Sequence, residues 1–475
     1  MFMSWEPLGA GLQDLFLVTK SDSSPADFYL DRRLGQYLRP TESPAFFMAP
    51  VRVGRVLPDG AMPPSTWLAV LQNLMHDLLG SFLNATLWSR ASRYLYPVGH
   101  CKEHLPSLLW EDIAFLMSHV QTELPGSFPE LEQVMGRMPR ESIAASSQVA
   151  SLLAAFYRDL AKVLPGVASE TRTVAIETRG RVDDGILKEI DDSYFAPVLQ
   201  FKRYVQQYLH PYVRRLYLHG SLSTLDYVRG YSDFDTLLIL KREVTADAAT
   251  LMQCRKSFLR SLPFLHIVDP LQHHGHLVLA EQDLSFYPQS YFPFVLFRFS
   301  KSFLQDSSVL VFQERDSTLE RQNALWRFCQ TVRRAFCCGE VFRSLYEWKA
   351  FIQGVVLLPA IYLQAVGEYT YKKFSFERAA KDFNEQQWRI IQKATILRRE
   401  WKAARTLPWP VTRALCASPN PFLLPFIHRR LNRAIPRICH TLIGANPAQE
   451  ALRLSEAMLA IRFPQLVQAA SLGGR

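Results

Sequence analysis

Two aspartates separated by one residue are the clearest candidates for chemistry in this chain. Asp233 and Asp235 flank Phe234 and lead into the apolar run Leu-Leu-Ile-Leu, which predicts a strand over residues 234–240. Side chains two positions apart on a strand point to the same face, so both carboxylates would project together. Two such carboxylates repel each other unless a cation lies between them, and hard oxygen ligands suit Mg²⁺. The pair therefore predicts a metal site suited to displacement at phosphorus.

A phosphate-binding turn is predicted upstream of this pair. Gly220 and Ser221 follow a β-rich run at residues 213–219 and precede a predicted short helix at 222–228. Gly220 has no Cβ, so a phosphate could approach its backbone closely. The N–H groups that open the helix, together with the Ser221 hydroxyl, could then cradle phosphate oxygens.

This arrangement resembles the signature of the DNA polymerase beta-like nucleotidyltransferase superfamily. In that signature Gly-Gly or Gly-Ser precedes an Asp-apolar-acid triplet, and here eleven residues separate Gly220-Ser221 from Asp233-Phe234-Asp235. Ser232 adds the Ser-Asp-x-Asp form of the small members and is placed with Gly220 and Ser221 in the nucleotide site. The resemblance covers none of residues 1–165.

The resemblance implies an activity and its cofactors. Members transfer a nucleoside monophosphate from an NTP to a hydroxyl acceptor, and pyrophosphate leaves. Two Mg²⁺ ions, or Mn²⁺, would be held by the aspartates. The acceptor could be a small molecule, a protein or RNA. Alternatives are a non-catalytic nucleotide-binding scaffold or sensor of the same fold, and an RNA-binding protein.

A third carboxylate is also implied by the resemblance, normally on a neighbouring strand, where it would act as metal ligand and base. Asp269 is the first candidate, because it ends an apolar run at residues 264–268 that predicts a strand. Glu281 and Asp283 stay open as alternatives, although Asp283 is also typical of a helix N-cap.

Four histidines surround this candidate, and they could bind a transition metal. Their spacing matches no closed zinc site, so we interpret them as polar residues of a turn between two strands. A role in lining the cleft is the alternative. The four are His266, His273, His274 and His276.

Basic residues that could neutralise a triphosphate are expected from a helical domain beside the sheet, as in the resembling proteins. Lys372, Lys373 and Ser375 are the candidates for binding the nucleotide, and Ser375 is also placed to cap the next helix. The alternative is an ordinary solvated helix start.

The net charge of +10 comes from the C-terminal part of the chain. Residues 391–475 hold 13 Lys and Arg against 3 Asp and Glu, which accounts for the whole excess. Aromatic residues are interleaved with the basic ones over residues 398–437, a combination that can bind nucleic acid. It equally fits helices that pack through their aromatic side chains. The balanced charge of residues 1–390 argues against a protein dominated by RNA binding.

Hydrophobic periodicity predicts a mixed α/β (α+β) chain in three parts. The expected domains are residues 1–184, with a proline-rich irregular start and a helical module, residues 185–317, with a small sheet, and residues 318–475, a helical domain with a basic tail. A helix is expected over 186–209, strands over 213–219, 234–240, 264–268 and 276–279, and a buried helix over 355–366.

The same sequence carries no sign of a membrane or secreted protein. No apolar run reaches the roughly 18 residues needed to span a bilayer, and no Lys or Arg precedes Lys20. Seven cysteines without a C-x-x-C pair favour free thiols. We therefore expect a cytoplasmic protein without a transmembrane segment.

Overall fold

The protein combines helices with two small β-sheets, as the mixed class requires. The computed structural model describes residues 65–84, 105–138, 145–271, 275–289, 291–304, 309–316, 345–401, 407–416, 423–432 and 447–463, with a few single residues between the later segments. The expected irregular start at residues 1–64 lies outside them. None of the described helices is long and apolar enough to cross a membrane.

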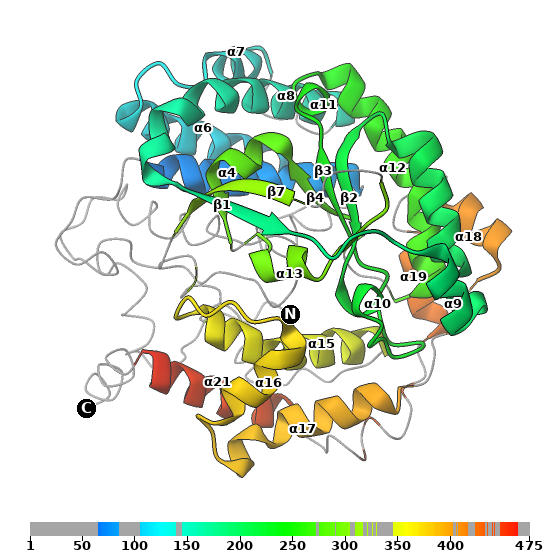
Figure 1. The fold of residues 1–475 in the computed structure, drawn as a ribbon. Coiled ribbons are helices and arrows are strands. Elements are labelled where there is room, and N and C mark those ends of the chain that lie inside the picture. The colour runs from blue at the N-terminus through cyan, green and yellow to red at the C-terminus, as the bar shows by residue number, and fades with distance from the viewer. Residues whose placement is uncertain are drawn as a thin grey trace, which may run out of the picture.

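A four-stranded sheet lies at the centre of the fold (Figure 1). Its strand order is β4 (Leu277–Ala280), β3 (Thr236–Leu240), β2 (Val213–Leu218) and β6 (Lys301–Ser302). Strand β2 runs antiparallel to β3, whereas β3 and β4 are parallel. Three of the four expected strands are thus present, but β3 begins at Thr236, so Asp233 and Asp235 precede the strand and do not lie on it.

The fourth expected strand, at residues 264–268, is wrong, because these residues form the end of helix α12 (Ala248–Val268). Asp247 caps this helix by accepting a hydrogen bond from the Thr250 N–H, at 2.8 Å. Buried side chains then recur at steps of three and four residues, which is the helical period. They are Leu251, Cys254, Phe258, Ser261, Leu265 and Val268. The connection between the parallel strands β3 and β4 requires such a crossover.

Both faces of the four-stranded sheet are buried, and alternate residues of its strands belong to different cores. Leu216, Leu238 and Val278 pack with the N-terminal helices, whereas Tyr217, Leu237 and Leu279 face a second sheet. That sheet has the order β1 (Arg172–Glu177), β7 (Val309–Arg315) and β5 (Tyr287–Pro288). Burial on both sides explains why β3 reads as a continuous apolar run.

The N-terminal helices share one apolar core with the sheet. They are α4 (Ser65–Leu83), α6 (Leu105–Glu123), α7 (Pro129–Arg137) and α8 (Ser146–Val163), and helix α9 (Asp184–Tyr204) belongs to the same core. The expected boundary after residue 184 therefore runs through a continuous core. Short helices complete this part: η4 (Leu164–Glu170), η5 (Val205–Leu209), α10 (Gly220–Thr224), α11 (Arg242–Thr245), η6 (Glu281–Phe286) and α13 (Phe294–Arg298).

The C-terminal helices form a second core below the sheet in Figure 1. Its helices are α15 (Leu345–Gln364), α16 (Lys372–Ala380), α17 (Glu385–Arg399) and α21 (Pro447–Arg462). The buried helix expected over residues 355–366 is confirmed as the second half of α15. Helices α18 (Trp409–Cys416) and α19 (Leu423–Leu431) lie apart from this core, and α18 packs against α12.

Candidate active site

A cavity of about 790 Å³ separates the loops before β3 from the C-terminal helices. This volume falls in the range of small-molecule sites, roughly 300–1,000 Å³. The sheet side contributes His219 and the predicted residues Gly220, Ser221, Ser232, Asp233 and Asp235. The opposite wall comes from α15, α16 and α17 and includes Gln353, Lys372, Lys373, Trp388 and Arg398. The fold thus brings most of the predicted site residues to one cavity.

Gly220 opens helix α10 directly after β2 with a φ of +67°, a conformation that favours glycine. A Cβ at this position would overlap the carboxylate of Asp235. The missing side chain therefore makes room for Asp235, where the sequence suggested room for a phosphate. Helix α10 ends at Thr224, earlier than the expected 222–228, and Ser221 remains half-buried at the cavity wall.

Asp233 is 7% exposed and both of its carboxylate oxygens accept hydrogen bonds from helix α15. Lys349 Nζ donates to Oδ1 at 2.5 Å, and Gln353 Nε2 donates to Oδ2 at 2.6 Å. Asp235 is half-buried, and its carbonyl accepts from the His219 N–H at 3.1 Å, which extends the β2–β3 pairing by one bond. The two aspartates are thus held rigidly by different elements.

Asp269 follows the last turn of α12 and is 2% exposed. Lys349 Nζ lies 2.7 Å from its Oδ2, and the Leu271 N–H donates to its Oδ1 at 3.0 Å. Burial raises the pKa of Asp269 to about 7, with Lys349 opposing the shift and Asp233 adding to it. Lys349 therefore contacts both Asp269 and Asp233, and Asp269 is absent from the residues that line the cavity.

Glu281 and Asp283, the alternatives to Asp269, lie at the other end of the sheet. They follow the C-terminal end of β4, whereas Asp233 and Asp235 precede the N-terminal end of the parallel strand β3. Glu281 accepts from the Arg242 N–H at 3.1 Å, and Asp283 accepts from the Ala280 N–H at 2.8 Å. Both carboxylates thus accept hydrogen bonds away from the cavity, and the strand direction excludes them from the site.

Lys349 is the central residue that sequence reasoning missed. It is 1% exposed and lies one helical turn before Gln353, in a helix whose other buried side chains are apolar except for Gln364 at its C-terminal end. Burial lowers the pKa of Lys349, but Asp233 and Asp269 outweigh that effect and the net shift is upward, so the ammonium stays protonated. The sequence signal that could have identified Lys349 is its spacing of four residues from Gln353 within an otherwise apolar helix.

The described residues contain no group of three or more His, Cys, Asp and Glu side chains that could hold a metal ion. Asp233 and Asp235 both line the cavity, and their carboxylates are of the type that could supply oxygen donors to a divalent ion there. The Lys349 ammonium contacts both Asp233 and Asp269. This arrangement differs from the expected one, in which three carboxylates surround shared metal ions.

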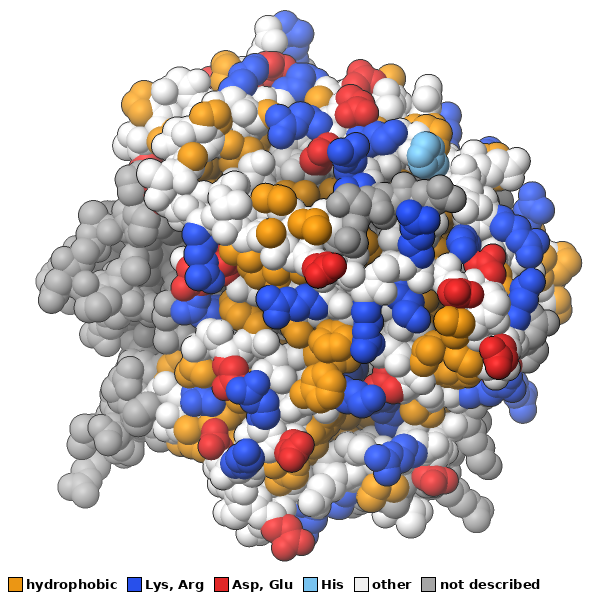
Figure 2. Space-filling model, viewed as in Figure 1, with side chains coloured by type: hydrophobic (Ala, Val, Ile, Leu, Met, Phe, Trp, Pro, Cys, Tyr) orange, Lys and Arg blue, Asp and Glu red, His pale blue; other side chains and the backbone are white. Residues whose placement is uncertain are grey.

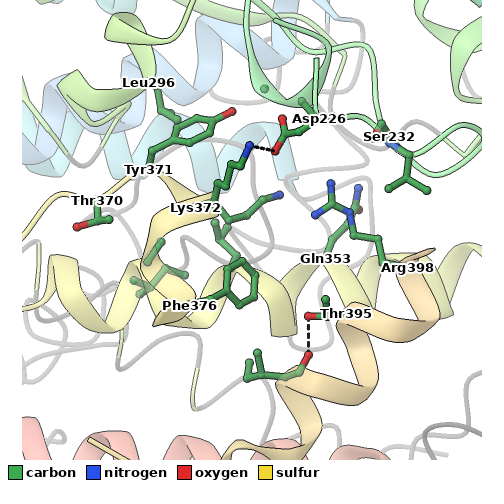
Figure 3. A pocket seen from close by; sticks show the side chains of 18 of the residues that line it. Asp226, Ser232, Leu296, Gln353, Thr370, Tyr371, Lys372, Phe376, Thr395 and Arg398 are labelled. Atoms are coloured by element: carbon green, nitrogen blue, oxygen red, sulfur yellow. Dashed lines mark hydrogen bonds and ion pairs between the residues drawn. The ribbon is translucent and has the colours of Figure 1, made fainter. Parts of the chain in front are cut away.

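Basic side chains reach the same cavity from α16 and α17 (Figure 3). Lys372 is half-buried, and burial, together with Arg398, lowers its pKa while the nearby aspartates oppose that shift. Lys373 is exposed and lies 3.9 Å from Asp226 Oδ2. The Arg398 guanidinium stacks over the Tyr231 ring at 5.5 Å. Arg398, which the sequence placed in a possible nucleic-acid surface, therefore belongs to this cavity.

Two predicted serines have structural roles. Ser375 is the fourth residue of α16, so it does not cap the helix as expected, and its Oγ donates to the Lys372 carbonyl at 2.8 Å. Ser375 is also fully buried and does not line the cavity. Ser232 lines the cavity, and its Oγ accepts from the Val228 N–H at 2.8 Å, which fixes the turn before Asp233.

The histidines do not gather into one cluster among the described residues. His276 bridges Thr236 Oγ1 at 2.6 Å and Ser261 Oγ at 2.7 Å, which joins β3 to α12. His266 lies in α12 with its ring 5.7 Å from that of His428, and burial lowers their pKa values to about 3 and about 4. His273 and His274 lie outside the described residues.

The basic tail contributes aromatic side chains mainly to packing. Trp401 packs edge-on against Tyr231 at 5.4 Å, and Trp409 lies 5.0 Å from Phe264. Lys and Arg side chains are dispersed among acidic ones on the face shown in Figure 2. Lys402, Phe422, Arg433 and Arg437 lie outside the described residues.

The chain was also compared with known proteins. No protein family, curated protein or solved structure matches it significantly.

Proposed function

We propose that the protein is a Mg²⁺-dependent nucleotidyltransferase that moves a nucleoside monophosphate from an NTP to a hydroxyl acceptor. The observation that carries this proposal is the meeting of Asp233 and Asp235 with the Gly220-Ser221 turn at one cavity. The resemblance in sequence concerns the same residues, and the strand, turn, helix and strand that it requires are β2, α10 and β3.

Opposite charges divide the cavity in a way that suits an NTP. Asp233 and Asp235 would hold the metal ion, and Lys372 and Arg398 would bind triphosphate oxygens from the facing wall. When bound, Mg²⁺ would neutralise charge on the phosphates and polarise the reacting phosphorus. Carboxylates on one wall and cations on the other would orient the triphosphate along the cavity.

Uncharged side chains make up much of the remaining wall. Alongside Arg398 and Arg399, helices α15 and α17 present neutral side chains to the cavity. These are Gln353, Leu357, Ala360, Ile361, Gln364, Trp388, Ile391, Gln392, Thr395 and Ile396. Such a surface suits a nucleobase or an uncharged acceptor and excludes water from the reacting groups.

The test is pyrophosphate release by purified protein supplied with each NTP, Mg²⁺ and a panel of hydroxyl acceptors. We expect release with at least one pair of substrates. Asp233→Asn combined with Asp235→Asn should abolish it, whereas Glu377→Gln, an exposed carboxylate of α16 outside the cavity, should not. Full activity in the double variant, with its thermal unfolding unchanged, would contradict the proposal.

A second candidate is nucleotide binding without transfer, as in a scaffold or sensor. The ion pair of Lys349 with Asp233 favours it, because the ammonium occupies a carboxylate that a metal ion would need. This candidate predicts NTP binding with no pyrophosphate release across the whole acceptor panel. RNA binding that survives loss of both aspartates would instead indicate a role for the basic tail.

A further inference from the structure

We propose that the Lys349 ammonium is a resident cation that permanently fills one cation position of the site. The nucleotide would then bring in one divalent ion, held by Asp235 and Asp233, and Asp269 would not be a metal ligand. This inference rests on the proposed function only for the nature of the ligand, an NTP with its metal.

Lys349 has the geometry of a bridging cation. Its Nζ lies 2.5 Å from Asp233 Oδ1 and 2.7 Å from Asp269 Oδ2, so one ammonium joins two carboxylates. The contact with Asp233 is a short, charge-assisted hydrogen bond, and the contact with Asp269 is an ion pair. A metal ion could enter the same space only after the ammonium had left it.

The surroundings of Lys349 keep it in place. Its side chain is 2% exposed, it does not line the cavity, and its Nζ lies 5.6 Å from the Tyr231 ring centre. Gln353, one turn further along α15, donates to the second oxygen of Asp233. Withdrawing the ammonium would leave two buried carboxylates facing each other, which is strongly unfavourable.

What remains at the cavity matches the needs of a single ion. Asp235 and Asp233 line the cavity, whereas Asp269 lies behind the ammonium. Mg²⁺ commonly takes one or two carboxylates and completes its octahedral shell with substrate phosphates and water. Two protein carboxylates and a triphosphate are therefore sufficient, and a third carboxylate is not required.

The experiment counts bound Mn²⁺ by electron paramagnetic resonance, with a non-hydrolysable α,β-methylene ATP analogue present. We expect one protein-bound Mn²⁺ per chain. Asp235→Asn should weaken Mn²⁺ binding by about tenfold or more, whereas Asp269→Asn should change it by less than about twofold. Asp269→Asn is the matched control, because both variants replace a carboxylate by an amide of the same shape.

A further variant tests the cation itself. Lys349→Met should raise the count to two Mn²⁺ per chain, because the vacated space lies between two carboxylates. If this variant does not fold, Mn²⁺ binding by the Asp235→Asn and Asp269→Asn variants still tests the inference. Two Mn²⁺ in the unaltered protein, or equal weakening by Asp269→Asn and Asp235→Asn, would overturn the inference and leave the proposed function standing. One bound Mn²⁺ without pyrophosphate release would support the inference against the proposed function, and no bound Mn²⁺ would overturn both.

Discussion

Gly220 and Asp235 are in direct contact across the turn between β2 and β3, so that no side chain fits at residue 220. The glycine also has a positive φ of +67°. The absence of a side chain at residue 220 leaves room for the carboxylate of Asp235, which belongs to the candidate site.

Gly220→Ala should displace Asp235 and weaken Mn²⁺ and NTP binding together. It should also lower the free energy of unfolding, since a non-glycine residue in this left-handed conformation costs about 1–2 kcal/mol before any overlap is counted. Gly126→Ala is the matched control, with a φ of +76° and no atom within 4 Å of the added Cβ. In urea unfolding, the control should lower the free energy of unfolding only by the conformational cost of a non-glycine residue at positive φ. It should leave Mn²⁺ and NTP binding unchanged. Equal effects of the two substitutions would show that the contact with Asp235 is unimportant.

Lys349→Met should destabilise the fold by about 3–5 kcal/mol at pH 8, because it removes the cation from a buried ion pair and leaves two carboxylates. Adding Asp269→Asn should recover part of that loss, since one of the two charges is then removed. Lys373→Met, on an exposed side chain, should change stability by less than about 0.5 kcal/mol. Chemical denaturation of the four proteins measures all three effects. If Lys349→Met lowered the free energy of unfolding only slightly, the ion pairs of Lys349 with Asp233 and Asp269 would not stabilise the native state.

Asp269 should make stability depend on pH between about 4 and about 7. Its pKa in the folded protein is raised to about 7, above the ordinary value of an aspartate, so over this window the folded state binds a proton that the unfolded state has released. The free energy of unfolding should therefore fall as pH rises through the window and level off above it. Asp269→Asn should flatten this part of the profile. An unchanged slope in the variant would show that another group is responsible.

Lys372→Gln and Arg398→Gln should each weaken binding of the NTP by about tenfold, equally for ATP and GTP, because the lost contacts are with phosphates. Arg413→Gln is the control, since Arg413 is exposed on α18 and does not line the cavity. Titration with a fluorescent NTP analogue gives the affinities. A loss of affinity that differs between ATP and GTP would instead place Lys372 or Arg398 near the nucleobase.

Cys254 and Cys329 should resist alkylation at pH 8 in the native protein. Both thiols are buried, and burial raises their pKa values far enough to keep them protonated, to about 12 in Cys329. Iodoacetamide labelling followed by mass spectrometry should detect modification of these two residues only after unfolding. Rapid labelling of the native protein would contradict their burial.

Local patterns predicted the central unit of the fold well. Strands β2 and β3 and the Gly-Ser turn followed from apolar runs and glycine, and the cavity indeed collects Gly220, Ser221, Asp233 and Asp235. The run at residues 264–268 was misassigned because a short apolar stretch is compatible with either a strand or the end of a buried helix. The helical spacing of buried residues such as Leu251 and Phe258 upstream in α12 distinguishes the helix from a strand.

Contacts between distant segments were beyond sequence patterns. Asp269 was placed near Asp233 for the wrong reason, since it caps a helix and does not end a strand. Lys349 went unnoticed because a lysine in a helix is usually solvated, and only tertiary packing brings it between two carboxylates. Arg398 was assigned to a basic tail for the same reason, although α17 directs it into the cavity.

The ion pair of Lys349 also has a consequence for the order in which the protein is made. Asp233 and Asp269 are synthesised well before the helix that carries their counter-ion. Before α15 has been synthesised, the nascent chain therefore contains two aspartates without their counter-ion, and these cannot be buried together as anions. The charge balance of these two buried carboxylates therefore depends on docking of α15, a helix that follows both aspartates in the chain.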